Sequence, residues 1–131
     1  MDTMTTVEID VEFTPDSPEE QASIESAVRE AAEGDSFKTG KGLGASGFEL
    51  TILAILGVRA LVDLVMLIRR EWRTGVVIDF EGEKVRVTKD PDLPKGEVII
   101  FHKDGTKVTR KQNEIDGLGD LITAAAKVFS K

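Results

Sequence analysis

The chain of 131 residues has the usual length of one domain and is too short for two well-packed cores, so we expect a single domain over residues 1–131. Hydrophobic residues make up 40% of it and charged residues 31%, a composition typical of globular rather than disordered proteins. Cysteine is absent, which excludes disulfides, thiolate nucleophiles and cysteine-based zinc sites, and is compatible with a reducing cytoplasm.

The formal net charge of -7 comes from the first third of the chain. Residues 1–47 carry eleven acidic and three basic side chains, whereas residues 48–131 carry thirteen acidic and fourteen basic ones. Such an acidic chain repels phosphates, so we expect no nonspecific binding to nucleic acid. Residues 1–30 lack a basic start followed by an apolar run, so we expect no secretory signal and a cytoplasmic location.

Apolar and acidic residues alternate over residues 7–13, which predicts a strand with one buried and one solvated face. Ser17 then precedes Pro18, with Glu20 at the third helical position, and this pattern indicates a capped helix that begins at Pro18. Gly34 is the expected C-cap of this helix. The apolar positions of the helix fall on one narrow stripe: Ile24, Val28 and Ala31.

The next two segments differ sharply in composition. Residues 35–47 hold four of the twelve glycines, which predicts a flexible connector. Residues 48–68 hold thirteen Leu, Ile, Val and Phe side chains, which predicts an apolar central helix long enough to cross a bilayer core of about 30 Å. Arg59 and Asp63 inside this segment each cost roughly 2.5 to 3.5 kcal/mol in a membrane and make insertion marginal. Two hypotheses follow: a buried core or assembly helix, or a single membrane span.

Four short β-prone runs follow: 76–80, 84–88, 98–102 and 106–110. The turn residues at 81–83 and 103–105 predict two hairpins, and the two prolines in 90–96 predict a loop between them. Residues 114–129 have the apolar spacing of a last helix. The predicted fold is α+β in the order β-α-α-β-β-β-β-α, a mainly antiparallel sheet packed against the central apolar helix and flanking helices.

Three patterns that could carry chemistry lack the context that this chemistry needs. Gly42, Gly44 and Gly47 match the spacing of a dinucleotide phosphate loop, but no parallel βαβ unit surrounds them. His102 is the only histidine and has no predicted nucleophile or orienting acid beside it. Asp90-Pro91-Asp92 begins like a calcium loop, but Pro94 and Lys95 occupy positions where oxygen ligands and a sharp turn would be expected. We therefore expect no catalytic residue, no cofactor and no metal site, and a protein that is not an enzyme.

The second half of the predicted central helix carries a charged stripe. On a helix, five residues fall close to one line: Arg59, Asp63, Met66, Arg70 and Arg73. Trp72 lies beside the C-terminal end of this line. We expect these six residues to contact a protein partner. Arg59 and Asp63 have the i, i+4 spacing of an ion pair, which is the plainer alternative for that pair.

The predicted order of elements is joined by a basic, Trp-containing helix end at residues 69–73 and by the strands at 76–80 and 84–88. In this layout the chain resembles the effector-associated constant component family of bacterial conflict systems. The resemblance covers most of the chain and implies a small non-enzymatic accessory protein that acts beside a separate effector. We therefore expect an adaptor or assembly component that binds an effector or self-associates through residues 48–73. The alternative is a small single-span membrane protein with a cytoplasmic β-rich domain.

Overall fold

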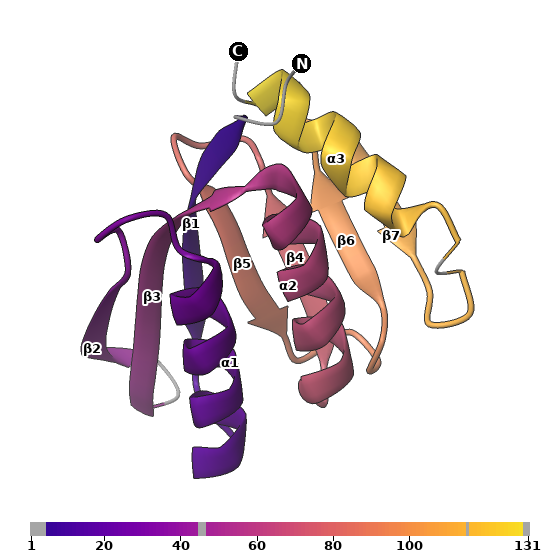
Figure 1. Cartoon of the computed structure of the whole chain (residues 1–131). Helices are drawn as coiled ribbons and strands as arrows, with labels where there is room; N and C mark the ends of the chain where they lie inside the picture. The colour runs from indigo at the N-terminus through magenta and orange to yellow at the C-terminus, as the bar shows by residue number, and fades with distance from the viewer. Residues whose placement is uncertain (1–4, 45–46, 115, 130–131) are drawn as a thin grey trace.

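Strands with one apolar face must bury that face against a second layer, and here three helices form the layer over a seven-stranded sheet (Figure 1). The computed structural model describes residues 5–44, 47–114 and 116–129. The strands are β1 (Thr6–Phe13), β2 (Lys38–Gly44), β3 (Gly47–Gly57), β4 (Gly75–Asp79), β5 (Val85–Asp90), β6 (Val98–Phe101) and β7 (Lys107–Arg110). The helices are α1 (Pro18–Ala31), α2 (Val58–Glu71) and α3 (Leu118–Phe129).

The strands lie in the order β2-β3-β1-β5-β4-β6-β7. The pairs β1/β3, β2/β3, β4/β5 and β6/β7 are antiparallel, whereas β1/β5 and β4/β6 are parallel. The predicted α+β class and mainly antiparallel sheet are therefore confirmed. The predicted order of elements is wrong in one place, because the hairpin of β2 and β3 lies between α1 and α2.

The prediction of one apolar helix over residues 48–68 is wrong. Its first half is the strand β3, in which every second side chain is buried: Leu50, Ile52, Ala54 and Leu56. The opposite face of β3 carries Leu53 and Ile55, so both faces are apolar and the period of two is hidden in the sequence. After Gly57 the burial period changes to that of a helix, with Leu61, Leu64, Val65 and Ile68 facing inward.

The prediction of a flexible connector over residues 35–47 is also wrong, because most of it forms β2 and the start of β3. Lys38 pairs with Leu53 and Gly42 with Glu49 in the antiparallel ladder. Strand β2 lies at the edge of the sheet, where lysines are common and where only one side of the backbone pairs with another strand.

The other predicted elements are present with shifted bounds. Ser17 caps α1 and accepts a hydrogen bond from the Glu20 backbone N–H at 3.0 Å, while Glu20 Oε1 accepts one from the Asp16 N–H at 2.9 Å. The predicted hairpins are formed by β4/β5 and by β6/β7. Helix α3 begins at Leu118, later than predicted. Gly117 has a φ of +81°, which is not a right-handed helical conformation, so the helix does not extend back through this residue. Ile115, in the predicted first turn, lies outside the described residues.

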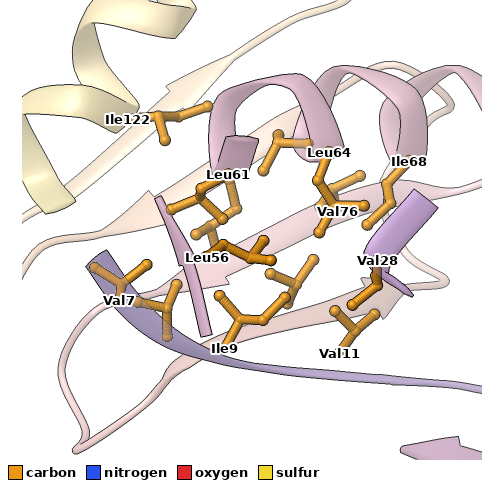
Figure 2. Packing of buried hydrophobic residues seen from close by; sticks show 14 of the residues in the cluster. Val7, Ile9, Val11, Val28, Leu56, Leu61, Leu64, Ile68, Val76 and Ile122 are labelled. Atoms are coloured by element: carbon orange, nitrogen blue, oxygen red, sulfur yellow. The ribbon is translucent and has the colours of Figure 1, made fainter. Parts of the chain in front are cut away.

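One cluster of buried side chains joins the inner face of the sheet to all three helices (Figure 2). Ile9 and Val11 of β1 meet Leu56 of β3 and Val28 of α1. Helices α2 and α3 cover the rest, and Ile122 of α3 is fully buried. Burial of this apolar surface is the main favourable term in folding.

Lys89 ties together the end of β5, the start of α1 and the end of α2. Its Nζ donates to the Thr14 carbonyl at 2.9 Å and contacts Glu20 Oε1 at 3.0 Å and Asp16 Oδ2 at 3.2 Å. The same Nζ lies 5.4 Å from the ring centre of Trp72, the residue that ends α2. The side chains of Lys89 and Glu20 are 12% and 6% exposed, so this ion pair is largely shielded from water.

No helix in the described part of the chain is both long and apolar enough to cross a membrane. The segment on which the membrane-span hypothesis rested is divided between a strand and a helix of 14 residues.

The two faces of β3 give a direct test of the corrected assignment. Leu56→Ala removes a fully buried side chain and should lower the free energy of unfolding by about 2 to 5 kcal/mol. Leu53→Ala on the opposite face should cost about 1 kcal/mol, because that side chain is only half-buried. Urea denaturation measures both. Equal losses in the free energy of unfolding would contradict the assignment of residues 47–57 to a strand with one buried face.

Removal of the Lys89 ammonium should destabilise the fold strongly. Lys89→Met leaves the carboxylate of Glu20 buried without its cation and should lower the free energy of unfolding by about 3 kcal/mol in urea denaturation. Lys84→Met is the control, because Lys84 makes an exposed 3.8 Å ion pair with Glu8 that is worth about 1 kcal/mol or less. If both variants lost a similar free energy of unfolding, the Lys89–Glu20 ion pair would contribute no more to stability than an exposed ion pair, which would contradict this prediction.

Candidate functional site

Helix α2 is the middle helix of the layer and lies between α1 and α3 (Figure 1). Its inner side is buried in the core, and its outer side carries Arg59, Asp63 and Arg70, which are exposed. Arg73, just beyond the helix, is also exposed, and Met66 is half-buried. The structure thus brings five of the six predicted partner-binding residues to the outside of α2 or to its end.

The sixth residue, Trp72, is fully buried, so it cannot contact a partner at the surface of the folded chain. Its ring lies 5.3 Å from that of Phe13 and is covered by Lys89. Trp72 therefore belongs to the core, where it fixes the end of α2 against β1 and β5. Sequence proximity to a basic cluster suggested an exposed role, but long-range contacts decide the burial of Trp72.

The C-terminal end of α2 is held by residues of two loops. Lys95 Nζ donates hydrogen bonds to the carbonyls of Arg70 at 2.7 Å and Trp72 at 2.9 Å, and so satisfies carbonyls that a helix end leaves open. Arg69 donates to the carbonyls of Gly96 at 3.0 Å and Gln112 at 2.8 Å. The end of α2 is therefore rigidly positioned.

The charges on the outer side of α2 have no partner within the described chain. Arg59 and Asp63 do not form the predicted i, i+4 ion pair, and the ion pairs that the described residues form involve other elements. Arg70 and Arg73 also form no ion pair there. Exposed charges cost little when solvated, so these side chains are available to an external group.

Hollows flank α2 on both sides. The groove toward α1 has a volume of about 320 Å³ and is lined by Ala27, Glu30, Ala31, Ala60, Asp63, Leu64 and Leu67. The hollow toward α3 has a volume of about 660 Å³ and is lined in part by Arg59, Asp63, Asp120 and Lys127. A third, of about 420 Å³, lies between Met66, Arg70 and the loop residue Lys95. Asp63 lines both the groove toward α1 and the hollow toward α3, so its side chain lies between the two.

None of the described helices covers the other face of the sheet, and this face carries many charged side chains. The strand register places one residue from each strand in a row across it: Lys38, Leu53, Asp10, Arg86, Asp79, Phe101 and Lys107. Arg86 donates to Glu12 at 2.9 Å, and Lys84 lies 3.8 Å from Glu8. Opposite charges on neighbouring strands offset one another, which is typical of a solvated sheet face.

Asp10 is the unusual carboxyl group on that face. Burial raises its pKa from near 4 to about 6, helped by a hydrogen bond with the Glu12 carboxyl group and by the charge of Glu12, while Arg86 and Lys84 oppose the shift. Oδ1 of Asp10 is buried and has no hydrogen-bond donor among the described residues. The ionised form of Asp10 is therefore disfavoured in the fold.

Asp10→Asn should stabilise the fold at neutral pH. The folded-state pKa lies above the unfolded one, so the wild type loses stability as the pH rises from about 4 to about 6, and the asparagine variant does not. The gain should be about 1 kcal/mol above pH 6, because solvent screens a partly exposed carboxyl, and should vanish below pH 4. Thermal unfolding as a function of pH measures it.

Asp104→Asn is the contrasting variant. The pKa of Asp104 is lowered because its carboxylate accepts a 2.9 Å hydrogen bond from the Thr106 N–H. Asp104→Asn should therefore lose stability relative to wild type above pH 4, the opposite sign to Asp10→Asn. A gain of the same sign in both variants would contradict the assigned causes.

The described residues contain no group of three His, Asp or Glu side chains that could hold a metal ion. His102 lies at the β6/β7 turn, where its N–H donates to the Thr106 carbonyl at 2.8 Å. Gly42 and Gly44 lie in the edge strand β2 and Gly47 begins β3, so they do not form a turn between a strand and a helix. These residues lie far apart in the fold and form no common site.

Sequence reasoning missed the part of the site that α1 supplies. Glu30, Ala27 and Ala31 line the groove opposite α2, and the predicted apolar stripe of this helix includes only Ala31 of these three. The available signal was the spacing of Ser23, Ala27 and Ala31, small residues four apart that allow close approach to another helix.

No family model matches this chain, and no curated protein and no solved structure matches it either. The resemblance to the effector-associated constant component family therefore stays a prediction.

Proposed function

We propose that this chain is a non-catalytic adaptor or assembly component that binds a protein partner through the outer side of α2. The partner is an effector protein or a second copy of the chain, as the resemblance to a bacterial conflict-system family implies. The single observation that carries the proposal is the position of α2, which stands between two hollows with exposed charges that nothing in the described chain neutralises.

The rigidity of α2 supports this proposal. Its inner side is anchored by four fully or nearly fully buried residues, and its end is held by Lys95 and Arg69. A preorganised helix loses little conformational entropy when a partner binds, so the contacts that it makes are retained as affinity. Exposed arginines flanking a half-buried methionine such as Met66 are typical of interface surfaces.

The charge distribution supports a protein partner over nucleic acid. The net charge of -7 repels phosphate backbones at long range. The outer side of α2 mixes Arg59, Arg70 and Arg73 with Asp63, and such mixed charges select a complementary partner more than they add to affinity.

Co-purification tests the proposal. The full chain, tagged and expressed at native abundance in its own cells, should retain a stoichiometric protein partner or elute as a defined oligomer. Arg59→Glu combined with Arg70→Glu should reduce that association about tenfold, because both side chains are exposed and reverse their charge at the proposed interface. Quantitative mass spectrometry of the eluate and light scattering measure the result.

The matched control is Lys107→Glu combined with Lys111→Glu, which changes the net charge equally at exposed positions in and after β7. The control should retain the partner. A partner lost equally by both double variants would reveal a dependence on net charge alone, and a partner kept by the α2 variant would place the interface elsewhere; either result would refute the proposal.

A further inference from the structure

We infer that the groove between α1 and α2 binds an amphipathic helix of a partner protein that presents lysine or arginine at the contact. This inference rests on the proposed function and adds the chemistry of the partner. It is carried by the apolar floor of the groove and by the charges on its two rims.

The floor of the groove is apolar, and small side chains keep it open. Ala27 and Ala31 come from α1, and Ala60, Leu64 and Leu67 come from α2. Leu64 is only 3% exposed and closes the bottom, whereas the alanines and Leu67 are half-buried and leave a hollow of about 320 Å³. Side chains of a third helix can enter such a hollow as the ridges of one helix enter the grooves of another.

Each rim of the groove carries one carboxylate. Because α1 and α2 run in opposite directions (Figure 1), the last turn of α1 lies beside the first half of α2, and Glu30 and Asp63 line the same hollow. Both are exposed, and neither side chain forms an ion pair within the described residues. Arg59 lines the hollow on the other side of α2, so no cation lines this groove.

An apolar floor between two carboxylates fits a long aliphatic stem with a cationic head. Lysine and arginine can lay their methylene groups on the alanines and leucines while their charged ends reach Glu30 and Asp63. The net charge of -7 also attracts a basic partner at long range and increases its association rate. A helix fits the groove better than a strand does. The backbone N–H and C=O groups of α1 and α2 are already hydrogen-bonded within the helices, so they cannot pair with the backbone of an added strand.

A labelled peptide of about 18 residues, with leucines on one helical face and lysines elsewhere, tests the inference against the full chain by fluorescence anisotropy. Glu30→Gln combined with Asp63→Asn should weaken binding about fivefold to tenfold. Glu83→Gln combined with Asp92→Asn removes the same charge from exposed turn and loop positions and should weaken it less than about twofold. The same peptide with glutamate in place of lysine should not bind.

A second pair of variants tests the shape of the groove with all carboxylates intact. Ala31→Leu fills part of the hollow and should weaken peptide binding about fivefold. Ala22→Leu makes the same change at an exposed position of α1 that does not line the groove and should leave binding unchanged. Circular dichroism melts verify that each variant is folded.

The inference would be overturned by equal weakening in the two carboxylate double variants, by unchanged peptide binding in Ala31→Leu, or by no peptide binding to the wild type. If the peptide fails to bind while partner capture still depends on Arg59 and Arg70, the inference falls and the proposed function stands. Self-association that disappears with Glu30→Gln and Asp63→Asn, without peptide binding, would assign the groove to a second copy and also overturn it.

Discussion

The shielded ion pair between Lys89 and Glu20 fixes how the helical layer sits on the sheet. Lys89 extends from the end of β5, Glu20 belongs to the first turn of α1, and the ring of Trp72 at the end of α2 lies against the same ammonium group. One cation therefore positions the start of one helix and the end of the next. A buried pair of this kind is weak evidence for net stability, but it strongly disfavours arrangements in which either charge is left alone.

The groove between α1 and α2 follows from this arrangement. With the start of α1 and the end of α2 held together, the opposite ends of the two antiparallel helices are separated only by the side chains between them, which include Ala27, Ala31 and Ala60. Those alanines are too small to close the space. The outer charges of α2, among them Asp63 between two hollows, form no ion pair with the described residues, and this is why we propose that they contact a partner.

Local signals in the sequence were sufficient for much of the fold and for part of the site. The alternation of apolar and acidic residues predicts β1, and the N-cap serine predicts α1. Turn residues predict both C-terminal hairpins. The boundary at Gly57 was hidden because Leu53 and Ile55 make the outer face of β3 apolar too. The parallel pairs β1/β5 and β4/β6 depend on contacts distant in sequence. For the same reason, the burial of Trp72 could not be predicted.

We propose that a partner binds in the groove beside α2 and not on the face of the sheet opposite the helices. Methyl NMR spectroscopy during titration with the basic amphipathic peptide can distinguish the two surfaces, because both carry methyl groups. We expect chemical shift changes at Ala27, Ala31 and Ala60, with no change at Leu53 and Ile55 on the opposite face of the molecule. Changes confined to Leu53 and Ile55, or spread evenly over all five, would contradict it.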